Sequence, residues 1–473
     1  MDDPFPDAVG PLHAAAPEIL SRLLSVDTDA AELFAEQTYR ERFRLRYDRW
    51  RAYGDPWEEY VTGIVEGTGL RVLTGDATRY ASVDGLDPAF VRIKADQLRA
   101  GPPGEVYLDR FPPRGSLALP VDTVDRVSLE EKRSLLQAAV DAALSQAPRL
   151  RDLEVEFQGT TRQTYVASTD ERPTFAASSL VGIRVEATFE RGERHFHVYA
   201  IGGGTGGIGQ FILSPPEQIS RACVKRMQTS LQARPLSGSM GSVPVIIEGG
   251  WGGVWLHEAL GHLLEADTPG SYGADRIGDR IAPEHVTIVD DGTFEDGRGT
   301  ALFDDEGCPM QRTVLVEAGE LRNVMSDRLQ SRRMGIPRTG NGRRESHRSE
   351  PIVRMTNLLL EGGTATREAL VADVAKGLYV RTIGTGKVYP SEDRYAFEVL
   401  EGSLIENGRL TMPVARLQIS GRPSQMLESI AGIADDFRVD SARGMCSKAG
   451  QIVPVSVGMP TVMVRNLTVT ALS

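Results

Sequence analysis

One short segment constrains the fold and chemistry of this chain more than any other: residues 249–267, which read GGWGGVWLHEALGHLLEAD. The segment holds His257, Glu258 and His262 in the pattern HExxxH. Two imidazoles can bind a zinc ion, and a carboxylate beside the first can accept a proton from water. The pattern therefore indicates a zinc hydrolase, although two histidines on a helix can also be ordinary polar surface groups.

The spacing of the two histidines requires a local distortion of the helix that carries them. On a regular helix, residues four apart diverge by about 40°, but residues five apart diverge by about 140°. A shared metal therefore requires one overwound or bulged turn, which Gly261 would permit at lower steric cost. The preceding residues predict a rigid mount for this turn: a buried strand over 244–247, a tight turn over 249–253, and a helix from Val254.

The length of 473 residues exceeds what one hydrophobic core supports, so we expect an α+β protein built from several units. Residues 1–28, rich in Pro, Asp and Ala, predict a poorly structured segment with a short helix around residues 16–24. Residues 29–100 predict an N-terminal α/β domain. Residues 101–127, with GPPG and FPPRG, predict a linker or crossover. Residues 128–240 predict a central α/β domain, and residues 241–473 a strand-rich C-terminal domain that contains the HExxxH motif.

Local signals place several helices in these units. Asp87 followed by Pro88 predicts a helix start, with the helix reaching about Leu98. Ser128 and Glu131 form a capping-box pattern ahead of a helix that ends at about residue 144. Another helix is predicted over about 217–233.

Composition excludes several classes of partner. The net charge of -12 argues against a general nucleic-acid or anionic-membrane surface. No uninterrupted apolar run is long enough to span a bilayer. The only cysteines are Cys223, Cys308 and Cys446, and three scattered cysteines imply a reducing compartment. We therefore expect a cytoplasmic protein.

A zinc hydrolase site with two histidines usually adds a third protein ligand and leaves one position for water. Cys446 follows a glycine-punctuated turn and precedes an apolar strand, so it is either such a ligand or a buried inert thiol. His195 and His197 share one face of a predicted strand, and a solvated face explains them better than a metal does. These residue patterns alone do not identify the third metal ligand.

Two glycine-rich stretches suggest other sites. Residues 204–209 contain a formal GxGxxG, but without a surrounding βαβ unit they favour a flexible loop or close backbone approach over dinucleotide binding. Residues 339–346 read TGNGRRES and place Arg343 and Arg344 on a glycine-rich loop. These arginines could anchor a peptide or carboxylate, or belong to a solvated turn.

Several motifs together resemble one family. They are HEALGH, DDGT at 290–293, FDDEG at 303–307, TGNGRRES, RMTN at 354–357, and the closing CSKAGQIVPVSVGMPTVMVRNLTV. In this order they resemble the TldD/PmbA (TldE) family of modulator-of-gyrase metallopeptidases, and the likeness runs from about Ala30 to the C-terminus. Trp251 and Trp255 are bulkier than we expect for the family, and because they flank the motif we expect them to influence substrate preference.

The resemblance implies a TldD-type zinc peptidase. Residue by residue, it assigns His257, His262 and Cys446 as Zn²⁺ ligands and Glu258 as the catalytic glutamate. It implies substrates that are unfolded or small peptides, including precursors of modified peptides. It also implies a heterodimer with a TldE-like subunit, with a homodimer left open. Two alternatives stand beside it: a specialised amidase for one biosynthetic intermediate, and a peptide-binding subunit with a vestigial site.

Overall fold

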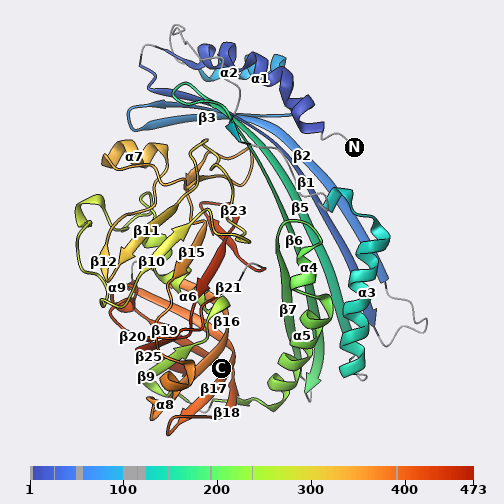
Figure 1. Cartoon of the computed structure of the whole chain (residues 1–473), viewed down its shortest axis with the longest axis vertical. Coiled ribbons are helices and arrows are strands. Elements are labelled where there is room, and N and C mark those ends of the chain that lie inside the picture. The colour runs from blue at the N-terminus through green and yellow to red at the C-terminus, as the bar shows by residue number, and fades with distance from the viewer. Residues whose placement is uncertain are drawn as a thin grey trace.

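A long curved sheet faces a strand-rich second half in the computed structural model of the chain (Figure 1). The structure describes residues 4–25, 27–48, 57–99, 114–115, 124–147, 150, 152–191, 194–236, 238–389, 392–440 and 442–472. The mixture of helices with largely antiparallel sheets confirms the predicted α+β class. No helix within these ranges is both long and apolar enough to cross a membrane.

The curved sheet runs in the order β3-β2-β1-β5-β6-β4, with β7 also paired to β6. Its strands are β1 (Ala30–Asp48), β2 (Trp57–Thr74), β3 (Ala77–Asp84), β4 (Arg114–Gly115), β5 (Asp152–Ser168), β6 (Thr174–Arg191) and β7 (Arg194–Thr205). Because side chains alternate along a strand, the two faces differ. On β1, Leu33 and Phe43 are buried on one face, while Glu32 and Glu36 belong to the other.

Among the described residues, the helices that pack on this sheet lie on one of its faces (Figure 1). The first two, α1 (Pro4–Leu23) and α2 (Pro88–Leu98), pack on one end of that face, whereas α3 (Leu129–Gln146) and α5 (Pro216–Gln232) pack on the other end. A short helix, α4 (Gln210–Leu213), precedes α5. Asp87 caps α2, and Ser128 with Glu131 forms a complete capping box on α3. Both predicted helix starts are therefore confirmed.

The expectation of a poorly structured segment over residues 1–28 is wrong for its described part. Helix α1 buries Val9, Leu12, Ile19 and Leu20 completely against the sheet, despite prolines at positions 11 and 17. An apolar helix face outweighs composition here, because its burial on the sheet stabilises the helix.

The expected separation of residues 29–100 from residues 128–240 is also corrected. Strand β1 pairs with β5 along nearly its whole length, from Glu32 opposite Ser168 to Asp48 opposite Asp152. The two segments therefore build one sheet rather than two. Most of the expected linker over 101–127 lies outside the described residues; within the described part, β4 joins the same sheet beside β6.

Two larger sheets form the second half of the molecule. The first runs β12-β11-β10-β15-β24-β21, and the second runs β16-β9-β25-β19-β17-β18-β8, with β20 on β25. The strands of the first sheet are β10 (Ile288–Asp291), β11 (Arg312–Glu317), β12 (Glu320–Leu321), β15 (Asn357–Leu360), β21 (Arg438–Asp440) and β24 (Ser456–Met459). Those of the second are β8 (Arg234–Pro235), β9 (Gly241–Ile247), β16 (Lys376–Tyr389), β17 (Arg394–Glu406), β18 (Arg409–Ala415), β19 (Leu417–Gly421), β20 (Ile430–Ile433) and β25 (Val462–Ala471).

Smaller elements complete this half. Two isolated strand pairs are β13 (Gly342–Arg343) with β14 (Ile352–Val353), and β22 (Met445–Lys448) with β23 (Gln451–Pro454). The helices are α6 (Gly253–Ala259), α7 (Arg328–Met334), α8 (Arg367–Ala372) and α9 (Pro423–Met426). Single turns of 3₁₀-helix are η1 (Val124–Arg126), η2 (Gly250–Gly252), η3 (Gly261–Leu264) and η4 (Ala274–Arg276).

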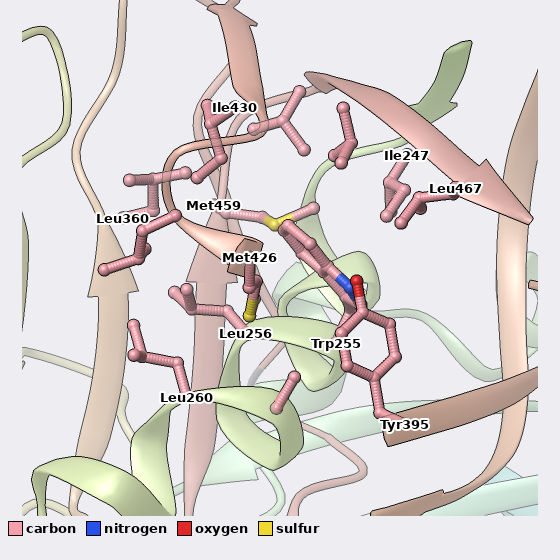
Figure 2. Close-up of a cluster of buried hydrophobic side chains, with 14 of the residues drawn as sticks. Ile247, Trp255, Leu256, Leu260, Leu360, Tyr395, Met426, Ile430, Met459 and Leu467 are labelled. Atoms are coloured by element: carbon pink, nitrogen blue, oxygen red, sulfur yellow. The ribbon is translucent and has the colours of Figure 1, made fainter. Parts of the chain in front are cut away.

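Helix α6 is buried in the hydrophobic core of the second half (Figure 2). Trp255 is fully buried and meets Tyr395 edge to face, with ring centroids 6.4 Å apart. Trp255 is therefore a core residue, which corrects the expectation that it influences substrate preference. Trp251 donates from Nε1 to the Ile383 carbonyl at 3.0 Å and is half-buried.

Buried ion pairs join the two halves across the uncovered face of the curved sheet. Arg344 donates to Glu32, and the backbone N–H of His347 donates to Glu36 at 2.7 Å. Arg71 of β2 pairs in the same way with Glu306. Each partner is almost completely buried, so these contacts hold the second half in a defined position on the sheet.

Candidate metal centre

The HExxxH segment is mounted on a strand through a glycine-rich turn, as the sequence predicts. Strand β9 ends at Ile247, the single turn η2 follows, and α6 begins at Gly253. A Cβ at Gly249 would lie 2.5 Å from the Met459 carbonyl oxygen, so only glycine lets the turn pack this closely against the sheet. The base of α6 is thereby held against β24.

The predicted distortion between the two histidines is present as a break in the helix. Helix α6 ends at Ala259, Leu260 has φ -126° and ψ -45°, and the chain continues as the 3₁₀ turn η3. A 3₁₀ turn winds more tightly than an α-helix, so this is an overwound connection. It rotates His262 back toward the side of α6 that carries His257.

Gly261 serves this break through close packing rather than through unusual dihedral angles. Its φ is not positive, but a Cβ there would lie 2.3 Å from Met355 Sδ. The turn can therefore approach the strand residues beneath it only with glycine at this position.

The break brings three possible metal ligands together. His257, His262 and Cys446 each offer a donor atom, and all three donors lie within 4.8 Å of one another. Cys446 Sγ lies 3.6 Å from His262 Nε2, and the two imidazole rings are 5.2 Å apart at an angle of 79°. His257 and Cys446 are buried, while His262 is partly exposed.

Cys446 is supplied by the hairpin β22–β23, which is 184 residues away along the chain from His262. Its strands are joined by Ala449 and Gly450, which have φ values of 51° and 77°. Two residues with positive φ form the tight turn that suits an antiparallel hairpin. Because strand side chains alternate, this register puts Cys446 and Lys448 on the same face.

A hydrogen-bonded group behind His262 fixes its ring. His262 Nδ1 lies 2.7 Å from Glu265 Oε2, and Lys448 Nζ donates to the same oxygen at 2.9 Å. The backbone N–H of Met355 donates to the other oxygen of Glu265 at 3.1 Å. The carboxylate thus leaves Nε2 of His262 as the nitrogen available to a metal. Sequence reasoning missed Glu265 and Lys448. The only signals in the sequence are that Glu265 follows His262 by three residues and that Lys448 follows Cys446 by two.

The electrostatics of the three donors suit a thiolate. Burial alone would raise the pKa of Cys446, but the adjacent His257 and His262 rings lower it to about 4. Burial by itself would lower the pKa of both histidines. The neighbouring Cys446 outweighs burial for His257, so its pKa is raised. For His262, Cys446 and Glu265 together outweigh burial and raise the pKa to about 10. For Glu265, burial is outweighed by His262 and Lys448, so its pKa falls to about 2.

The residues fit a zinc ion. Nδ1 of His257 is buried without a hydrogen-bond partner among the described residues, so this ring keeps an unused nitrogen. Two imidazole nitrogens and one thiolate form a donor set that zinc prefers, with a fourth position left over. Glu258 is half-buried, and within the described chain no hydrogen bond or ion pair occupies its carboxylate. Its carboxylate is therefore free to accept a proton.

Comparison with known proteins finds related sequences along most of the chain. The sequence model of the PmbA/TldA metallopeptidase C-terminal domain matches residues 240–471. A Buchnera aphidicola protein named metalloprotease TldD homolog is 31% identical, covering 85% of this chain and 86% of that protein. The chain belongs to the PmbA/TldD family. The sequence-based prediction of a metallopeptidase is therefore confirmed.

Two further relatives of this PmbA/TldD chain carry more specific names. A Saccharolobus solfataricus protein named zinc metalloprotease TldD homolog is 32% identical over 52% of this chain and 57% of that protein. The crystal structure of TldE from Thermococcus kodakarensis has the same fold, with a TM-score of 0.70 at 16% identity and coverage of 98% and 99%.

The remaining sequence candidates lie elsewhere in the PmbA/TldD chain. His197 is exposed and contacts Thr188, while the side chain of His195 lies outside the described part. Cys223 and Cys308 are buried, and neither belongs to the cluster of possible metal ligands found in the described residues. Of the GxGxxG glycines, Gly206 has φ 111°, which is a turn conformation rather than a helix start.

Arg343 and Arg344 are not part of a solvated turn. Arg343 donates to the carbonyl oxygens of Met355 at 2.6 Å and Pro454 at 2.8 Å. Arg344 donates to Glu32 and stacks over the ring of Phe34, with its guanidinium carbon 4.2 Å from the ring centroid. Both residues are buried, and both line a cavity of about 540 Å³.

Proposed function

We propose that this PmbA/TldD-family chain is a zinc-dependent peptidase that hydrolyses amide bonds in unfolded or small peptides. The observation that carries this proposal is the convergence of His257, His262 and Cys446 within 4.8 Å, from segments far apart in the sequence. The name of the Saccharolobus relative supports zinc as the metal.

In this proposal each residue has a distinct task. His257, His262 and Cys446 hold the zinc ion, which when bound polarises the scissile carbonyl and makes water more acidic. Glu258 accepts the proton from the attacking water and passes it to the leaving amine. Glu265 and Lys448 keep the ring of His262 oriented.

The hairpin that carries Cys446 offers a way to hold an extended peptide. Within the described residues β22 pairs only with β23, so its outer edge has no strand partner. A peptide that adds to this edge would be bound mainly through backbone hydrogen bonds. Such binding suits substrates without a strict sequence, including precursors of modified peptides.

Replacing Glu258 by Gln tests the proposal. We expect Glu258→Gln to retain about one zinc per chain by elemental analysis, as wild type would, and to lose peptide cleavage by at least ~100-fold. Cleavage at the wild-type rate would exclude Glu258 as the base. Wild-type protein without bound zinc would instead favour a peptide-binding subunit, and activity confined to one compound in a substrate panel would favour a specialised amidase.

We also propose that the chain works with a TldE-like subunit in the cytoplasm. The family resemblance supports this partnership, and a homodimer is the competing arrangement. Size measurement of the chain alone and after co-expression with a TldE-like protein separates the two. A heterodimer predicts a stable mixed species, whereas a self-sufficient homodimer predicts no mixed species.

A further inference from the structure

A cavity of about 540 Å³ lies between the uncovered face of the curved sheet and the hairpin β22–β23. Its sheet side consists of alternate residues of three neighbouring strands: Thr38 and Arg40 of β1, Thr160 and Arg162 of β5, and Ser178 and Arg184 of β6. Its other side includes Met445, Ile452 and Pro454 of the hairpin. The cavity is therefore adjacent to the strand that supplies Cys446.

The lining of this cavity is strongly basic although the chain as a whole is acidic. Seven arginines line it, against two acidic residues, Asp305 and Glu345. Both carboxylates are engaged, because Asp305 pairs with Arg162 at 3.1 Å and Glu345 accepts from the backbone N–H of Ile452 at 3.3 Å. In a chain of net charge -12, such a concentration of positive charge requires an explanation.

Three of these arginines have no carboxylate partner among the described residues. Arg343 donates only to two backbone carbonyls, and Arg298 donates to the carbonyls of Gly444 at 3.2 Å and Ala442 at 3.4 Å. Arg40 is exposed, and the described part of the chain offers it no hydrogen bond or ion pair. Burial lowers the pKa of Arg343 to about 10 and also lowers that of Arg298. The carboxylates of Asp440, for Arg298, and of Asp305 and Asp290, for Arg343, attract these two cations but do not offset their burial. An anionic ligand in the cavity would therefore stabilise this site.

A fourth arginine of the cavity, Arg443, has a buried N–H group without a hydrogen-bond acceptor in the described structure. Arg443 lies 3.2 Å from Asp440 through Nε, but its Nη1 is buried without a hydrogen-bond partner in the described structure. An unpaired buried donor is costly, and a bound acceptor would remove this cost.

The hairpin relates the cavity to the metal centre by simple strand geometry. Met445 lines the cavity, whereas the next residue, Cys446, belongs to the metal centre, so the two sites lie on opposite faces of β22. A peptide added to the outer edge of β22 would direct alternate side chains to these two faces. Its backbone would lie beside the metal centre while every second side chain, or its chain end, could enter the cavity.

We propose that this cavity binds carboxylates of the peptide substrate, and this inference rests on the peptidase function proposed above. The carboxylate belongs either to an Asp or Glu side chain or to the C-terminus of the peptide, and guanidinium groups recognise both in the same way. The volume is within the range of small-molecule pockets, and the apolar Leu180, Ile201 and Ile452 share the lining. These features suit a peptide segment better than a nucleic acid.

Binding of matched peptides to zinc-loaded Glu258→Gln protein tests this inference without cleavage. One fluorescent hexapeptide carries an internal Glu and a free C-terminus; a second replaces Glu by Gln, and a third has a C-terminal amide. We expect removal of the recognised carboxylate to weaken binding by about tenfold. The peptide that loses affinity identifies which carboxylate is bound.

Arginine variants in the same Glu258→Gln background assign the effect to the cavity. Arg40→Gln and Arg298→Gln should each reduce the difference between the acidic and neutral peptides. Arg46→Gln is the matched control, because Arg46 lies on the same strand β1 and is exposed outside the cavity. Because Arg40 is exposed and unpaired, its variant should fold even if Arg298→Gln does not.

Three outcomes would overturn the inference: equal affinity for all three peptides, a difference unchanged by Arg40→Gln, or stronger displacement of the acidic peptide by an oligonucleotide than by unlabelled peptide. None of these measurements needs turnover. A chain that fails to cleave peptides but binds acidic ones in this way would refute the proposed hydrolysis and retain the carboxylate site.

Discussion

The two histidines of the proposed metal centre are supported unequally. His262 is oriented by Glu265, which is itself held by Lys448 and by a backbone N–H. His257 has no such partner on Nδ1 in the described structure and is oriented by packing within the core. The proposed ligand on the irregular turn, His262, is therefore oriented by a hydrogen-bond network, whereas the proposed ligand on α6, His257, is oriented by the packing of its helix.

Glu265→Gln should therefore weaken metal binding. The amide keeps the shape of the side chain but loses the charge that orients the ring of His262, and loss of such a supporting group typically costs about 10–100-fold in metal affinity. Competition with a zinc chelator measures this change.

Glu258→Gln is the matched control for this variant, since it makes the same chemical change at a glutamate that makes no hydrogen bond to the ring of His262 in the described structure. We expect its zinc affinity to stay within a few fold of wild type. Equal affinity in both variants would mean that Glu265 does not support the centre.

Sequence reasoning reached the centre only in part. HExxxH pointed to two ligands and to Glu258 from residue chemistry alone, but Cys446 was left open until the family resemblance favoured it. Glu265 and Lys448 were missed because the chain has 65 acidic and 53 basic side chains, and spacing does not show which of them face a given ring. The contact between Lys448 and Glu265 arises only when a distant hairpin packs on the turn.

At the scale of secondary structure, the break after α6 makes the unusual histidine spacing workable. The helix is only seven residues long, and its C-terminal end merges into a 3₁₀ turn rather than a loop. The fully buried Leu256 and Leu260 flank this transition and belong to the same core. The core thus holds the distorted turn in place.

Gly261→Ala should destabilise this turn. The added Cβ would lie 2.3 Å from Met355 Sδ and 3.0 Å from Leu358 Cδ2, so the side chains beneath must move. Overpacking of this kind costs about 1–3 kcal/mol in the free energy of unfolding. Denaturant unfolding of the variant measures the cost.

Gly63→Ala provides the comparison, because nothing lies within 4 Å of a Cβ at that strand position. We expect its stability to change by less than about 0.5 kcal/mol. If both variants unfolded like wild type, Met355 would have to relax freely and the close packing would have no energetic role.

Elements with local signals were predictable, and those that depend on remote pairing were not. The capped starts of α2 and α3 follow from Asp87, Ser128 and Glu131 alone. Only a short helix around residues 16–24 was expected where α1 (Pro4–Leu23) forms, because prolines interrupt the segment, whereas the stability of the helix derives from burial. The pairing of β1 with β5 joins residues more than 100 positions apart, and no local pattern reveals it.

At the scale of the whole molecule, the segment around His347 in the second half contacts the curved sheet. His347 is fully buried there, with Nδ1 3.1 Å from Glu36 and Nε2 2.9 Å from Asp84. Gly67 makes room for the ring, since a Cβ at that position would lie 2.2 Å from His347 Nε2. Each of these carboxylates also forms an ion pair with an arginine, Asp84 with Arg348 and Glu36 with Arg162.

This contact should weaken as the pH rises. Burial lowers the pKa of His347, but Glu36 and Asp84 outweigh burial and raise it above its ordinary value near 6.5. A raised folded-state pKa means that the stabilisation is complete below about pH 6.5 and is lost as pH rises through the raised value. The free energy of unfolding, measured between pH 5 and 9 for wild type and His347→Gln, should differ most at the acidic end.

Taking the difference between the two proteins removes the contribution of other titrating groups, such as Asp304 and Asp327, whose pKa values are raised to about 7 mainly by burial. The exposed His285 provides a matched His285→Gln control, which should follow the wild-type curve. Parallel curves for wild type and His347→Gln would show that this imidazole does not titrate with folding.

The ribbon formed by β22 and β23 delivers Cys446 and Lys448 together, and no third strand holds it within the described chain. If this hairpin separates from the turn, the thiol of Cys446 and the ammonium of Lys448 leave together. His262 then loses Cys446 beside Nε2, and Glu265 loses the hydrogen bond from Lys448. The proposed zinc ion could then leave, once the buried hydrogen bonds from Arg354 to the carbonyl oxygens of Cys446 and Gln451 also break. Demetallation should accordingly proceed at the opening rate of ten residues, far faster than the protein unfolds.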